Sequence, residues 1–169
     1  MRKFKEDDKG MTLVELIVVV GIISVMLTAV FLGTGLATSK EASGCAGKIA
    51  TTLQNSRLTA MGKADGAVNT VIRRDATGNV VIVETVSGTE VSNTVIGKPR
   101  LSVKYRVGAG ALQELPEGGS IVISFDRSTG GLKKTAEGGS QYYTAIEISG
   151  GGRVSTVTLV PLTGRISVD

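Results

Sequence analysis

The hydrophobic pattern of the chain changes twice along its length. Residues 16–36 read LIVVVGIISVMLTAVFLGTGL and contain no ionisable side chain. At about 1.5 Å per residue, a helix of this length is roughly 30 Å long, which is the thickness of the hydrocarbon core of a membrane. The pattern therefore predicts a transmembrane helix over residues 11–37, a segment in which Glu15 is the only charged residue.

After residue 38 the apolar positions follow one face of a helix. The apolar stripe consists of Ala46, Ile49, Ala50, Leu53 and Ala60. We expect the helix to continue out of the membrane over residues 38–63, where Gly62 and the Asp65-Gly66 pair are the stop signals. A sheet is expected to cover its apolar stripe.

From residue 67 onward apolar and polar side chains alternate with a period of two, which is the pattern of half-buried strands. The predicted strands cover residues 68–74, 80–86, 101–107, 121–125, 141–149, 154–160 and 165–168. A long N-terminal helix followed by successive antiparallel strands predicts an α+β fold. The globular domain is expected to span residues 38–169 and to include the second half of the helix.

The composition fits one membrane anchor and one small domain. Among 169 residues, aromatic side chains make up 4% and 23 residues are glycine, which favours many turns and short strands. The net charge is +4. Residues 1–10 contain four basic and three acidic side chains, so the rest of the chain carries a net +3. Basic residues ahead of the span predict that residues 1–10 are cytoplasmic and that the C-terminal domain lies outside.

The chain lacks the residues of common catalytic and metal sites. It has no histidine, and its single cysteine, Cys45, can form neither an intramolecular disulfide nor a thiolate zinc site. Gly47-Lys48 is not a phosphate loop, because Ala42 and Ile49 stand where that motif has glycine and serine or threonine. We therefore expect a structural protein without a catalytic site, metal or cofactor.

Two interpretations of Cys45 remain open. It is either a redox or intermolecular thiol, or a small side chain packed on the helix. The second interpretation is favoured.

Glu15 is the residue that a simple membrane anchor does not explain. A carboxylate near the centre of a span costs on the order of 2.5 kcal/mol or more, so it normally has a partner. The nearest cation, Lys9, lies on the polar side, just before Gly10. A cut after Gly10 would give Met11 a free amine four residues from Glu15 on the same helix face. Such a cut would supply the missing positive charge.

These residues resemble the N-terminal processing signal of type IV pilins and type II secretion pseudopilins. The resemblance rests on the basic leader ending in Lys9-Gly10, on Thr12-Leu13, on a glutamate five positions after the glycine, and on the apolar run behind it. It implies that a prepilin peptidase cuts between Gly10 and Met11 and methylates the new amine of Met11. It also implies that Glu15 pairs with the terminal amine of a neighbouring subunit during filament assembly.

Two other interpretations of the N-terminus stay open. A secretory signal peptide also has a basic start and an apolar core, and Gly35-Leu36-Ala37 would serve as its cleavage site, although such cores typically have about 7–15 residues. A simple single-span anchor is the second. Neither explains Glu15.

Within this family, the Phe125-Asp126-Arg127 turn and residues 161–166 resemble the H-type minor pseudopilins and the FimT-type minor pilins. FimT-type pilins that bind DNA have a C-terminal Gly-Arg-x-Arg, but this chain has Gly164-Arg165-Ile166-Ser167 and lacks the second arginine. The missing arginine argues against DNA binding, so DNA uptake is kept only as an alternative function. Its candidate residues form a basic row, Arg100, Lys104 and Arg106, with Arg153 and Arg165. A solvated outer strand face is the favoured interpretation of that row.

The resemblance implies a minor pilin or pseudopilin held in the cytoplasmic membrane with its C-terminal domain outside. The partners implied are other pilin subunits, the prepilin peptidase, the inner-membrane assembly platform and membrane lipid.

Overall fold

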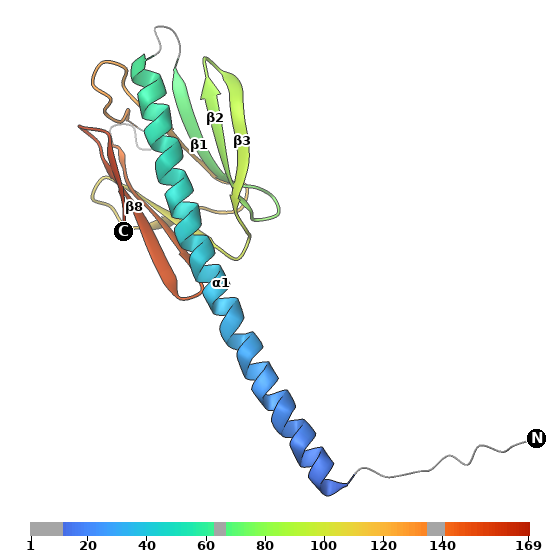
Figure 1. The fold of residues 1–169 in the computed structure, drawn as a ribbon. Coiled ribbons are helices and arrows are strands. Elements are labelled where there is room, and N and C mark those ends of the chain that lie inside the picture. Colours follow the sequence, from blue (N-terminus) through green and yellow to red (C-terminus); the bar gives the residue numbers. More distant parts are fainter. Residues whose placement is uncertain (1–11, 63–66, 135–140) are drawn as a thin grey trace, which may run out of the picture. The chain divides into compact units, whose positions relative to one another are not determined.

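The computed structural model describes residues 12–62, 67–134 and 141–169, except for the side chains of residues 29–37. The chain divides into two units, residues 1–35 and residues 36–169, and each is described by itself. One helix, α1 (Leu13–Gly62), contributes residues to both units (Figure 1).

The first part of α1 is apolar on all sides. Every described side chain from Thr12 to Thr28 is exposed, and Leu13 and Val25 have exposed fractions of 75% and 72%. The hydroxyls of Ser24 and Thr28 donate to the carbonyls four residues earlier, at 2.8 and 2.9 Å, so these polar groups are satisfied within the helix. A helix that is hydrophobic all round requires an apolar environment outside this unit.

Within the described part of the chain, no helical segment meets both the length and the apolar character that crossing a membrane requires. Of the predicted transmembrane segment, residues 11–37, Met11 and the side chains of residues 29–37 lie outside the described residues. The transmembrane span stays a prediction.

The second unit contains two antiparallel sheets against which the second half of α1 packs. The first sheet has the order β3-β2-β1-β6, and the second has the order β5-β4-β7-β8-β9. The strands are β1 (Val68–Arg74), β2 (Val80–Val86), β3 (Thr89–Gly97), β4 (Ser102–Val107), β5 (Gln113–Glu114), β6 (Ser120–Ser124), β7 (Tyr143–Gly150), β8 (Arg153–Val160) and β9 (Arg165–Val168). This arrangement confirms the predicted α+β fold.

The core lies between α1 and the inner faces of both sheets (Figure 1). The helix contributes a stripe in which Ile49 and Leu53 are completely buried. The other buried helix residues of the core are small: Ala42, Cys45, Ala46, Ala50 and Ala60. Small side chains at these positions let the helix backbone approach the strands closely. All five residues of the predicted apolar stripe are buried, so the stripe is confirmed.

The structure contains one long strand that the alternating pattern did not predict. β3 pairs with β2, but the register skips Val91 and Ile96, so each is an extra residue in a β-bulge. Each bulge reverses the alternation of apolar and polar positions. The period of two is therefore lost in the sequence of β3.

Polar contacts join the layers where apolar packing ends. The Ser56 hydroxyl on α1 donates to Glu84 Oε1 at 2.7 Å, and the Thr70 hydroxyl donates to Ser56 Oγ at 2.8 Å. Ser56 and Thr70 are 1% and 0% exposed. Because each buried hydroxyl has a partner, this chain of hydrogen bonds links the helix to the first sheet and leaves neither hydroxyl unsatisfied.

Two aspartates organise the exposed turns. Asp75 accepts from the Thr77 hydroxyl at 2.7 Å, and Asp126 accepts from the Ser128 hydroxyl at 2.6 Å. These bonds, together with bonds from neighbouring backbone amides, lower the pKa of each carboxyl to about 2. Both turns are thus held by ionised side chains at neutral pH.

The chain crosses itself closely at Gly164. Its φ is +61°, and a Cβ at this position would collide with the carbonyl of Gly130. The same carbonyl accepts a 2.9 Å hydrogen bond from Arg57 Nε on α1. Glycine is therefore required at residue 164 both by the backbone angle and by the approach of a second backbone segment.

Replacing Gly164 should reveal this double requirement. Gly164→Ala is expected to lower the free energy of unfolding by about 2 kcal/mol or more beyond the cost of the left-handed conformation, because the backbone at Gly130 must move. Gly152→Ala is the matched control: Gly152 has a φ of +79° but no atom within 4 Å of the added Cβ, so it should cost only about 1–2 kcal/mol. Urea unfolding of both variants measures the difference, and equal midpoints would contradict the collision.

Candidate processing and assembly site

The first turn of α1 is closed by a reciprocal pair of side chains, Thr12 and Glu15. Thr12 precedes the helix and occupies the N-cap, so Glu15 occupies the third helical position. Glu15 Oε2 accepts hydrogen bonds from the Thr12 backbone N–H and from the Thr12 hydroxyl, both at 3.0 Å. The Glu15 N–H donates back to Thr12 Oγ1 at 3.3 Å. This geometry is a capping box.

The capping box fixes where the negative charge lies. The Glu15 carboxylate is folded back over the start of the helix, where the helix dipole favours an anion. The hydrogen bonds described for this side chain all reach Oε2. The other oxygen, Oε1, therefore remains able to accept from a cation outside the chain.

The sequence analysis singled out Glu15 but missed Thr12 as its hydrogen-bond partner. The signal was present in the sequence, since threonine followed three residues later by glutamate before an apolar run is the signature of a capping box. The capping box supplies neutral donors and no positive charge, so the need for an external cation is unchanged.

Gly10 and Met11, the predicted cleavage residues, lie outside the described residues. Their roles stay predictions. Since the described chain begins at Thr12, the N-cap, an amine on Met11 would be one residue ahead of the capped turn that holds Glu15.

Cys45 is buried in the core of the second unit. It is 1% exposed, and burial raises the pKa of its thiol to about 12. A protonated thiol without solvent access is a poor nucleophile. The structure therefore supports the packing role of Cys45 and not the redox role.

The basic row is only partly brought together. Lys104 and Arg106 share one face of β4, whereas Arg100 precedes the strand and forms a 3.8 Å ion pair with Glu41. Arg165 begins β9, which is three strands away from β4 in the second sheet. Of the candidate polyanion-binding residues, Lys104 and Arg106 thus lie side by side, whereas Arg100 and Arg165 lie apart from them.

Carboxylates flank the centre of this row. Lys104 pairs in register with Glu114 on β5 and with Glu147 on β7. Opposite charges on directly paired residues interact across strands and reduce the positive potential of this face. Arg106 faces Ala145 instead. The face offers a weak attraction for a polyanion, and DNA binding stays an untested alternative.

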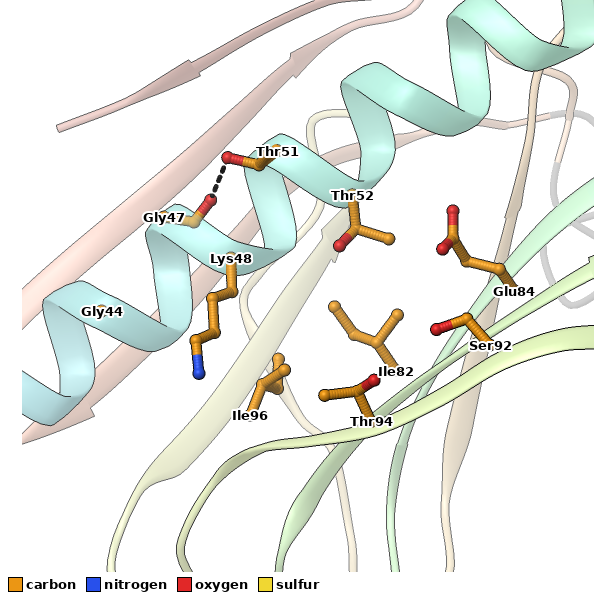
Figure 2. Close-up of a pocket in the computed structure, with 10 residues that line it drawn as sticks. All are labelled: Gly44, Gly47, Lys48, Thr51, Thr52, Ile82, Glu84, Ser92, Thr94 and Ile96. Carbon is orange, nitrogen blue, oxygen red and sulfur yellow. Dashed lines mark hydrogen bonds between the residues drawn. The ribbon is translucent and has the colours of Figure 1, made fainter.

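A cleft of about 460 Å³ lies between α1 and the inner face of β2 and β3 (Figure 2). Thr52, Ile82 and Thr94 point into it, with Lys48 and Glu84 toward its two ends. Gly47 and Lys48 lie in the middle of α1, so the backbone there is helical and cannot wrap a phosphate. Glu84 is engaged by Ser56. Among the described residues no group of three or more His, Cys, Asp or Glu side chains could hold a metal.

One comparison with known families gives a match. Residues 7–31 match the prokaryotic N-terminal methylation motif, a segment that includes Gly10, Met11, Thr12 and Glu15. Neither the curated proteins nor the solved structures contain a match to the chain.

The burial of Cys45 leads to a testable prediction. In the folded protein at pH 8, its alkylation by a maleimide should be about 100-fold or more slower than in the unfolded chain, because few thiols are ionised and none is accessible. The unfolded thiol ionises above about pH 9, whereas the folded thiol keeps its proton to about pH 12. Stability should consequently fall as the pH rises above 9. Intact mass after timed labelling measures the rate; rapid labelling under native conditions would contradict the burial.

Proposed function

Because residues 7–31 carry the prokaryotic N-terminal methylation motif, which supports membership of the type IV pilin and pseudopilin family, we propose that this chain is a minor subunit of a type IV pilus or a type II secretion pseudopilus. In this proposal a prepilin peptidase removes residues 1–10, methylates the amine of Met11, and leaves α1 as the helix through which the subunit is assembled.

The observation that carries the proposal is a carboxylate, Glu15, in the first turn of an apolar helix, within the segment that matches the methylation motif. Glu15 lies in the first turn of a helix whose other side chains from Leu13 to Met26 are apolar and exposed, apart from Ser24 and the glycine at residue 21. An unpaired carboxylate in such surroundings is unfavourable. A terminal amine of a neighbouring subunit would neutralise it.

The remaining roles follow from the same assignment. The subunit is anchored in the cytoplasmic membrane by residues 11–37 and exposes residues 38–169 outside. Its partners are other pilin subunits, the prepilin peptidase, the assembly platform and membrane lipid. The protein has no catalytic role and no cofactor. The single buried cysteine fits a minor subunit, since many major pilins close a C-terminal loop with a disulfide.

Processing is tested by the mass of the mature chain. The wild-type protein should begin at Met11 with one added methyl group, and Gly10→Leu should leave the full-length chain, because a bulky side chain blocks the peptidase. Gly21→Leu is the control: Gly21 has no atom within 4 Å of an added Cβ, so this variant should be processed normally. A wild-type chain that still begins at Met1, or begins after Ala37, would refute the proposal.

Assembly is tested at Glu15. Glu15→Ala and Glu15→Gln should both insert into the membrane normally, but their co-purification with other pilins should fall by about tenfold or more, which corresponds to only about 1.4 kcal/mol of lost pairing. Thr12→Val removes the capping hydroxyl and keeps the charge, so it should assemble far better than either Glu15 variant. If Glu15→Gln assembles at the wild-type level, the amide hydrogen bond is sufficient and charge pairing is not the cause.

A further inference from the structure

The outer face of the first sheet is an ordered apolar surface that the proposed assembly through α1 does not use. The helix covers the opposite face, where Ile72, Ile82 and Ile121 are buried in the core. Because side chains alternate along each strand, the residues directly before and after each of these isoleucines point away from the helix.

The register of the strands arranges this outer face in three rows. The middle row is Val122, Val71, Val83 and Asn93; the row on one side is Ser120, Arg73, Val81 and Val95; the row on the other side is Ser124, Asn69, Thr85 and Glu90. Five of these twelve side chains are valines, and they are contiguous. We call these twelve positions the outer valine face.

The apolar part of the outer valine face is partly covered and partly exposed. Val81 and Val83, on the inner strand β2, are 3% and 7% exposed. Val95 and Val122, on the two edge strands, are 57% and 47% exposed. The two exposed valines thus lie on either side of an apolar centre, and serines, threonine and asparagines form a polar rim, as at protein interfaces.

The face carries charge at two positions, one in each of its two outer rows. Among the described residues of the face, Arg73 and Glu90 carry the only charged side chains, and both are exposed. Arg73 lies on β1 in one outer row, and Glu90 lies on β3 in the other outer row. The position halfway between them is Val83, on β2 in the middle row.

This placement makes the face complementary to itself. A two-fold axis in the plane of an interface exchanges two points when it crosses the midpoint of the line that joins them at a right angle. An axis through Val83 therefore brings Arg73 of each copy opposite Glu90 of the other, and it brings Val95 close to the same residue of the second copy. The strands of the two sheets then cross at a large angle, which is one of the two ways in which sheets pack face to face.

We propose that the outer valine face binds a second copy of this chain through a two-fold axis near Val83, with Arg73 of each copy paired with Glu90 of the other. The occupant is a second copy because the same face then supplies both members of each ion pair, Arg73 and Glu90. Such an isologous contact is the commonest form of homodimer.

The size of the face sets the strength of the contact. Strands lie about 4.8 Å apart and residues on one face about 6.7 Å apart, so twelve positions cover about 400 Å² on each copy. A stable interface buries about 800 Å² per partner, so this dimer is weak and must be trapped covalently to be counted.

Cross-linking of the full chain in membranes of expressing cells tests the proposal. Val95→Cys, treated with a short bismaleimide, should give a product of twice the subunit mass. Val154→Cys is the matched control, because Val154 is 55% exposed but lies on β8 of the second sheet, and it should give no such product. The parent chain, whose Cys45 is buried, should also give none.

Charge reversal identifies the partner. In the Val95→Cys background, Arg73→Glu or Glu90→Arg alone should lower the dimer fraction about fivefold or more, because each places like charges opposite one another at both ion pairs. The two substitutions together restore both pairs and should return the fraction to about the parental level, which also shows that neither substitution unfolds the domain.

Three results would overturn the proposal: no homodimer from Val95→Cys, a homodimer that does not respond to the charge reversals, or an equal yield from Val154→Cys. A cross-linked product of another mass, formed instead of the homodimer, would also overturn it by showing that a different protein occupies the face. These readouts do not depend on cleavage after Gly10, so they are independent of the proposed filament role.

Discussion

The packing of one helix stripe against two sheets at once is the constraint on which the folded domain depends. Ile49 and Leu53 each lose all contact with solvent, which stabilises the fold by roughly 2 kcal/mol per side chain. Between and beside them, Ala42, Ala46 and Ala50 keep the helix close to the strands. A larger side chain at one of these alanines would separate the helix from both sheets, because interiors are close-packed and transmit such a displacement. The same stripe therefore sets the spacing of the whole domain.

The two parts of α1 have opposite requirements although they form one helix. In residues 38–62 the buried apolar side chains lie on one side of the helix, and most of the other side chains are exposed or half-buried. In the described residues of the first part, apolar side chains lie on every side, and the polar groups are bonded back into the helix at Ser24 and Thr28. Glu15 is the exception to this rule, since two neutral donors from Thr12 do not neutralise a carboxylate. Thr12 thereby holds the carboxylate of Glu15 in a fixed position, and neutralising it requires a cation from another molecule.

The sequence predicted local features better than the partners of each strand. The bounds of β1, β2 and β9 agree with the predicted ranges because glycine-containing turns separate these strands from their neighbours. β3 was missed because its two bulges break the period, and β5 has only two residues. The division into two sheets was not predicted either. Alternation shows which side chains share a face, but β6 pairs with β1 after a separation of about fifty residues, and that choice depends on the whole core.

The sequence was also more informative about the N-terminal segment than about the basic row on the second sheet. Spacing along one chain was sufficient to select Gly10, Met11 and Glu15, because cleavage and charge pairing involve consecutive residues. It was not sufficient for the basic row, because the charges around Lys104 come from Glu114 and Glu147 on strands that are distant in sequence. A row of like charges in a sequence becomes a binding surface only when the neighbouring strands leave it unneutralised. In this domain the strands on both sides of β4 place a carboxylate opposite Lys104, so the register of the sheet, and not the sequence of β4, decides the potential of that face.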